Sequence, residues 1–110
     1  MPTKQRTVAK ELATTNSTLY TVPTRYTTSV ASIIVSNASS SSVSFSLDWY
    51  DATTAIYYTI AEAVVLKPNS MLQITDGFFL QAGDAFRGLA SVDSVVTVSF
   101  SLEENYSVVV

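Results

Sequence analysis

The chain has 110 residues, of which 47% are hydrophobic and only 14% are charged, and its formal net charge is −3. This length fits one domain with a real core and is too short for two independent domains. Soluble domains usually carry about 25% charged residues, so the surface here has to be built largely from Ser, Thr, Asn and Gln. Such a surface gives little electrostatic protection against association, which is typical of proteins that live inside assemblies.

Cysteine and histidine are both absent from the sequence. Their absence excludes disulfides, cysteine nucleophiles, Cys/His zinc sites and Ser-His-Asp triads. We therefore predict no catalytic residue, no metal site and no cofactor, and we expect a protein that is not an enzyme. No apolar stretch approaches the roughly 20 residues that cross a bilayer, and the N-terminal segment has no apolar core of a signal peptide. We expect synthesis in the cytoplasm and no membrane partner.

Residues 1–16 lack strand periodicity and are predicted to form an extended N-terminal arm. Three of the six basic residues of the chain lie in this segment: Lys4, Arg6 and Lys10. Three charges without interleaved aromatic residues neutralise too few phosphates for useful affinity, so no nucleic-acid partner is predicted. We expect the arm to contact an acidic or polar patch of another protein.

From residue 17 onward, short runs of strand-forming residues are separated by turn residues, which is the pattern of an all-β sandwich or barrel. The first predicted strand, 17–23, stops at Pro23, because proline cannot donate to a ladder. The second strand, 27–37, contains three adjacent apolar residues, which indicates burial on both faces or a bulge. A serine-rich turn, 37–42, follows it.

The third predicted strand alternates serine with large apolar residues, and this period of two assigns its faces. Val43, Phe45, Leu47 and Trp49 are predicted to point into the core. The serines and Asp48 between them are predicted to form a flat outer face without long charged side chains. That face is either a plain solvent face or a contact with a neighbouring subunit, and both interpretations stay open at this point.

The second half of the chain continues the same pattern. Residues 55–67 predict two short strands with a break near Ala61–Glu62, followed by a proline turn at 67–70. Asp76-Gly77 is a tight-hairpin signal between strands at 70–75 and 78–81. Strands at 85–91 and 93–104 complete the domain. We therefore predict an all-β fold, a single jelly-roll-like β-sandwich of about eight antiparallel strands spanning residues 17–104.

Residues 105–110 form a predicted C-terminal tail that ends in three consecutive valines. Exposed valines are costly in water and offer an edge for strand pairing. They either complete the sheet of the same domain or add to the sheet of an adjacent subunit. Together with the arm, the tail gives the predicted partner-binding residues: Lys4, Arg6, Lys10, Tyr106, Val108, Val109 and Val110.

Two further groups of side chains suggest ligand sites and are weighed against ordinary structural roles. Five aspartates lie near predicted turns, where Asp is favoured for local hydrogen bonding, and they lack the density of a calcium loop. A group of tyrosines, Tyr50, Tyr57 and Tyr58, has the chemistry to stack on sugar rings. Adjacent tyrosines in a strand more often place one ring in the core and the other at its rim.

Several phrases of the sequence occur together in a recognisable order. "TLYTVPTRYTTSVASIIVSNASSSSVSFSLDWYD", "LKPNSMLQI", "FFLQAGDAFRGLAS" and "VSFSLEE" cover residues 18–104. This pattern resembles a family of small β-sandwich structural proteins of tailed-bacteriophage virions. The segment Lys67-Pro68-Asn69 stands where that pattern usually has a turn glycine, and the resemblance brings no catalytic residues with it.

The resemblance implies a virion structural protein attached to a phage particle, with the virion as its location. The specific expectation is a capsid decoration or cement protein bound to the outer head surface. The expected partners are the major capsid protein and further copies of the chain itself, with a trimer favoured. The alternatives are a tail, neck or baseplate component, and a receptor- or glycan-binding module on the particle.

Overall fold

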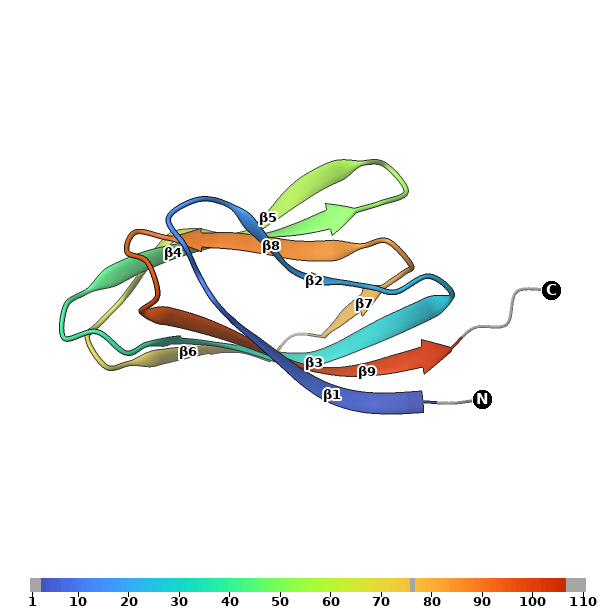
Figure 1. Cartoon of the computed structure of the whole chain (residues 1–110), viewed down its shortest axis with the longest axis horizontal. Coiled ribbons are helices and arrows are strands. Elements are labelled where there is room, and N and C mark those ends of the chain that lie inside the picture. Colours follow the sequence, from blue (N-terminus) through green and yellow to red (C-terminus); the bar gives the residue numbers. More distant parts are fainter. Residues whose placement is uncertain (1–2, 76, 107–110) are drawn as a thin grey trace.

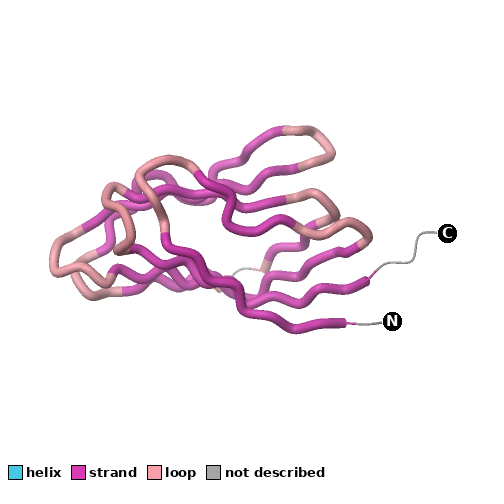
Figure 2. The backbone as a smooth tube through the Cα atoms, viewed as in Figure 1, coloured by secondary structure: helices cyan, strands magenta, loops and turns pink. Residues whose placement is uncertain are grey.

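The structure is a computed structural model that describes residues 3–75 and 77–106. Within these residues the chain forms nine strands and no helix, as Figures 1 and 2 show, and therefore no helix long and apolar enough to cross a membrane. The strands are β1 (Thr3–Glu11), β2 (Ser17–Thr21), β3 (Tyr26–Asn37), β4 (Val43–Asp51), β5 (Ile56–Leu66), β6 (Met71–Ile74), β7 (Phe78–Leu80), β8 (Ala85–Ala90) and β9 (Val96–Tyr106).

The strands form two antiparallel sheets that pack face to face (Figure 1). The first sheet has five strands in the order β1-β9-β3-β6, with β7 pairing with a second part of β3. The second sheet has four strands in the order β2-β8-β4-β5. The predicted all-β sandwich is confirmed, with nine strands in place of about eight, whereas the finer jelly-roll-like designation stays a prediction.

The core lies between the sheets and is built by the alternating strands. In β9 every second residue from Val96 to Glu104 is buried, and β4 buries Val43, Phe45 and Leu47. Trp49 continues this inward face but is only partly buried, because the end of the β4–β5 hairpin bends away from the five-stranded sheet (Figure 1). The predicted inward face of β4 is thus correct.

The outward serines of β4 have partners of their own. The Ser46 hydroxyl accepts a hydrogen bond from the Ala63 backbone N–H at 2.9 Å, and the Ser44 backbone N–H donates to the Ser91 hydroxyl at 3.1 Å. Gly88 on β8 faces the same strand, and a Cβ there would lie 2.8 Å from the Ser46 carbonyl oxygen. Small residues therefore permit β4 and β8 to lie close together.

The prediction of an N-terminal arm outside the sandwich is wrong for most of its length. Residues 3–11 are strand β1, which pairs with β9 from Thr3↔Asn105 to Glu11↔Thr97. Eight of its nine residues are exposed and Val8 is only half-buried, so the strand has no hydrophobic alternation to reveal it. Leu12, which follows it, is 1% exposed and belongs to the core.

Two other predictions differ from the structure. The break expected near Ala61–Glu62 is an irregularity inside one strand, β5, where the register with β4 shifts and Ala63 has a left-handed φ of 48°. The hairpin expected around Asp76-Gly77 is wrong in its pairing, because β6 and β7 both pair with β3 and not with each other. Asp76 itself lies outside the described residues.

Candidate interaction surfaces

Strand β1 forms one edge of the five-stranded sheet. Its nine residues pair with β9 on one side, and within residues 3–75 and 77–106 no strand pairs with its other side. An edge of this kind offers a row of main-chain donors and acceptors that a strand of another molecule can pair with. Most of the predicted partner-binding arm is thus an edge strand of the sandwich.

The three basic residues of this segment share one side of β1. The register places Lys4, Arg6 and Lys10 opposite inward-facing residues of β9, with which they share a face. The Arg6 guanidinium lies 3.3 Å from both carboxylate oxygens of Glu104 and is therefore engaged within the subunit. Lys4 and Lys10 are exposed.

Glu104 is the centre of a buried polar cluster that joins the two sheets. Its side chain accepts a hydrogen bond of 2.6 Å from the Tyr20 hydroxyl, which also lies 2.9 Å from the Thr28 hydroxyl. Burial, together with the bond to the Glu104 carboxylate, raises the pKa of Tyr20 to about 12. The cluster binds β1, β2, β3 and β9 together. A sequence signal for it exists, because Glu104 occupies the next inward position after Leu102.

The predicted C-terminal tail begins inside strand β9. Tyr106 is the last residue of that strand and pairs with Tyr26 of β3, with their ring centroids 5.4 Å apart in an edge-on arrangement. Tyr106 is therefore part of the sandwich and not of a separate tail. Val108, Val109 and Val110 lie outside the described residues, and their predicted role in partner binding stays a prediction.

The tyrosines considered for sugar stacking lie on the β4–β5 hairpin and do not form one platform. Tyr58 stacks on Trp49 with 5.3 Å between ring centroids, whereas Tyr57 packs against Tyr50 at 4.7 Å. The Arg87 guanidinium covers the ring of Tyr57 at 3.5 Å from its centroid. Tyr57 and Tyr58 are neighbours in one strand and project to opposite sides of it, so a single ligand cannot stack on both.

Two of the predicted turn aspartates, Asp51 and Asp84, hold the backbone of their own turns, whereas Asp93 bonds to a segment distant in sequence. The Asp84 carboxylate is buried and accepts hydrogen bonds from the backbone N–H groups of Ala52 and Gln81 at 2.9 and 3.0 Å. Asp51 and Asp93 likewise accept from backbone N–H groups. Asp48 differs, because it forms a 2.9 Å ion pair with Arg87. In the part of the chain that the structure describes, no acidic cluster could hold a metal ion.

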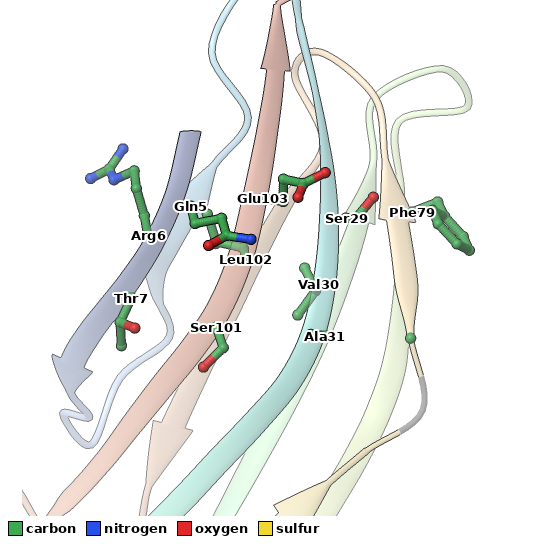
Figure 3. A pocket seen from close by; sticks show the side chains of 11 residues that line it. Gln5, Arg6, Thr7, Ser29, Val30, Ala31, Phe79, Ser101, Leu102 and Glu103 are labelled. Atoms are coloured by element: carbon green, nitrogen blue, oxygen red, sulfur yellow. The ribbon is translucent and has the colours of Figure 1, made fainter. Parts of the chain in front are cut away.

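A shallow groove runs across the outer face of the five-stranded sheet (Figure 3). Its volume is about 600 Å³, and Phe79, with 84% of its surface exposed, forms part of its wall. In register across four neighbouring strands lie Gln5, Glu103, Ser29 and Phe79. No pattern in the sequence indicates this group, because its members come from β1, β9, β3 and β7 and meet only through strand pairing.

Comparison with known proteins identifies the fold but no family. No protein-family model matches the chain, and no curated protein sequence matches it significantly. Three chains of solved structures match. One of them, from a structure of Bacillus endospore appendages described as a family of disulfide-linked pili, covers 98% of this chain and 88% of its own length, with a TM-score of 0.56 and 13% sequence identity. At this identity the likeness shows the β-sandwich fold alone.

Proposed function

We propose that the chain is a non-enzymatic structural protein of a bacteriophage virion, with capsid decoration as its specific role. The sequence resemblance over residues 18–104 supports this assignment, as does a surface of low charge built on a sandwich. The protein acts by binding neighbouring proteins of the particle. Its preferential binding to the assembled state stabilises that state by mass action.

The observation that carries this proposal is the open edge of β1. A strand of a capsid protein adds to this edge and extends the five-stranded sheet, with main-chain hydrogen bonds supplying affinity. Lys4 and Lys10 stand exposed along the strand and favour an acidic partner. Lysines on an edge also hinder indiscriminate pairing, so the same residues select for a partner of complementary charge.

Several copies of the chain act together in this proposal, with a trimer as the favoured form. The structural neighbour forms disulfide-linked pili, and its likeness supports only the general use of such a sandwich in an assembly. The 110 residues here contain no cysteine. Copies of this chain are therefore not joined by disulfides, and in this proposal strand edges and side-chain packing hold them together.

The test is to add the labelled protein to particles that lack it and to locate it by electron microscopy. Density on the outer head surface, together with greater resistance of the heads to heat, supports decoration. Density at the tail, neck or baseplate instead supports the alternative role of a structural component of that part of the particle. Failure to bind any part of the particle refutes the virion proposal.

A pair of charge reversals tests the β1 edge itself. Lys10→Glu changes an exposed residue of the edge, whereas Lys67→Glu makes the same change of charge in an exposed turn away from it. We expect Lys10→Glu to weaken binding to particles severalfold and Lys67→Glu to leave it unchanged, with both proteins folded. Equal binding by the two variants would show that the β1 edge is not part of the interface with the particle.

A further inference from the structure

We propose that the groove on the outer face of the five-stranded sheet binds a neutral saccharide through Gln5, Glu103, Ser29 and Phe79. This inference goes beyond the virion role and does not depend on it. The saccharide contacts side chains on the face of the sheet, whereas the proposed protein partner pairs with the backbone edge of β1. The two activities are therefore separable by experiment.

The four residues form a straight row because the strands hold them in register. Gln5 lies opposite Glu103, Glu103 opposite Ser29, and Ser29 opposite Phe79. Directly opposed side chains in a sheet stand about 5 Å apart, so the row is about 15 Å long. Two linked sugar rings fit within this length. Figure 3 shows the row crossing the face from β1 to β7.

The chemistry of the row matches that of a sugar. A saccharide ring has an apolar C–H face and a rim of hydroxyl groups that both donate and accept hydrogen bonds. Phe79 offers an exposed aromatic ring to the apolar face. The Gln5 amide and the Ser29 hydroxyl both donate and accept, and the Glu103 carboxylate accepts. Such an alignment of an aromatic ring with mixed polar groups suits an uncharged, polyhydroxylated ligand.

The charges around the groove favour a neutral ligand over an anionic one. Glu103 is the acidic side chain among the residues that line the groove, and Arg6 is the basic one. The Arg6 guanidinium is paired with Glu104, and its side chain points away from the groove in Figure 3. An anionic sugar would thus meet the Glu103 carboxylate without a cation of the groove to compensate it.

The size of the groove also fits this class of ligand. Its volume of about 600 Å³ lies within the range of roughly 300–1,000 Å³ that is usual for small-molecule sites. A second lining set, Thr7 and Ser101, adds hydroxyl groups beside the row, and these two residues are themselves opposed across β1 and β9. The groove therefore offers polar partners along its length.

The experiment is a titration of the isotope-labelled protein, followed by NMR, with neutral mono- and disaccharides up to the millimolar range. Sialic acid and a sialylated disaccharide serve as anionic comparators. We expect neutral sugars to shift the backbone signals of the row. Phe79→Ala should weaken binding about tenfold, since the stacking contact is lost, and Glu103→Gln severalfold. Met71→Ala, which removes another exposed apolar side chain of the same sheet outside the groove, should leave it unchanged.

Four results would overturn the proposal. The first is the absence of signal shifts with every neutral sugar. The second is that Phe79→Ala and Met71→Ala weaken the binding of neutral sugars equally. The third is that the anionic comparators bind more tightly than the neutral sugars. The fourth is a fall in the mass of the protein in light scattering on Phe79→Ala, without any change in sugar binding, because this would make the face a contact between copies of the chain.

Discussion

Arg6 balances the charge of a buried carboxylate, and its replacement by methionine tests how β1 is held to the sandwich. Glu104 is 1% exposed, and the Arg6 guanidinium lies 3.3 Å from it. At this distance the Coulomb energy is about 5 kcal/mol for an effective dielectric constant of about 20. The Arg6 side chain is 44% exposed, so solvent screens much of that attraction. We expect Arg6→Met to lower the free energy of unfolding by about 1–3 kcal/mol.

The assay is urea denaturation at neutral pH, followed by the fluorescence of Trp49 and extrapolated linearly to water. Glu104→Gln and the double variant complete a double-mutant cycle, from which we expect a coupling energy of about 1 kcal/mol or more. Lys10→Met is the matched control, because it removes one charge from an exposed position of the same strand that lies opposite Val98 and not opposite Glu104. Its effect should stay within about 0.5 kcal/mol.

Two outcomes would refute this reasoning. If Arg6→Met and Lys10→Met destabilise the protein equally, the contact with Glu104 contributes nothing beyond a surface charge. If the effects of Arg6→Met and Glu104→Gln simply add, the two side chains are not coupled. In either case the Arg6–Glu104 pair would add nothing to the hydrogen-bonded ladder with β9 that holds β1.

Three further changes test the core. The pKa of Tyr20 is raised from 10.0 to about 12, so the stability that this shift contributes, about 2–3 kcal/mol, is present below about pH 10 and is lost as the pH rises towards 12. Denaturation curves measured between pH 10 and 12 should show this loss of stability, and Tyr20→Phe should make the stability depend less on pH in that range. The same pH dependence in the variant would contradict the role of Tyr20. Gly88→Ala should destabilise the protein by about 2 kcal/mol, because the added Cβ would lie 2.8 Å from the carbonyl oxygen of Ser46. The readout is a lower Tm, and an unchanged Tm would mean that β4 and β8 lie further apart. Trp49→Ala should cost about 2–3 kcal/mol in urea denaturation followed by circular dichroism, less than a fully buried aromatic residue. A loss below about 1 kcal/mol would show that its ring makes little contact with the core.

Strands that face the core on one side could be predicted from the sequence. Alternate residues of β4 from Val43 to Leu47, and of β9 from Val96 to Leu102, are apolar, and the structure buries them. A period of two in hydrophobicity follows directly from the alternation of side chains along a strand between core and solvent. The turn roles of Asp51 and Asp84 were predictable for a similar reason, because each accepts a hydrogen bond from a backbone N–H group two or three residues away. Asp93 was not predictable in this way, because it accepts from the backbone N–H of Thr14, which is distant in sequence.

Strand β1 could not be predicted in this way. Its residues are exposed on both sides, so burial imposes no pattern on them. The strand forms because the backbone of residues 3–11 finds its partner in residues 97–105, at the other end of the chain. The same holds for the pairing of β6 and β7 with β3, since local turn chemistry at Asp76-Gly77 pointed to a hairpin between them.

By itself, the sequence determined that this is an all-β protein with a surface poor in charge. It also determined which residues of the alternating strands face inward. Composition and short-range periodicity suffice for these conclusions, because neither depends on contacts between distant segments. The tertiary structure decided which side chains meet. It brought Arg6 to Glu104, and it aligned Gln5, Glu103, Ser29 and Phe79 across four strands. Such groups arise from the register between strands distant in sequence, and a one-residue slip in that register would turn each side chain to the opposite face.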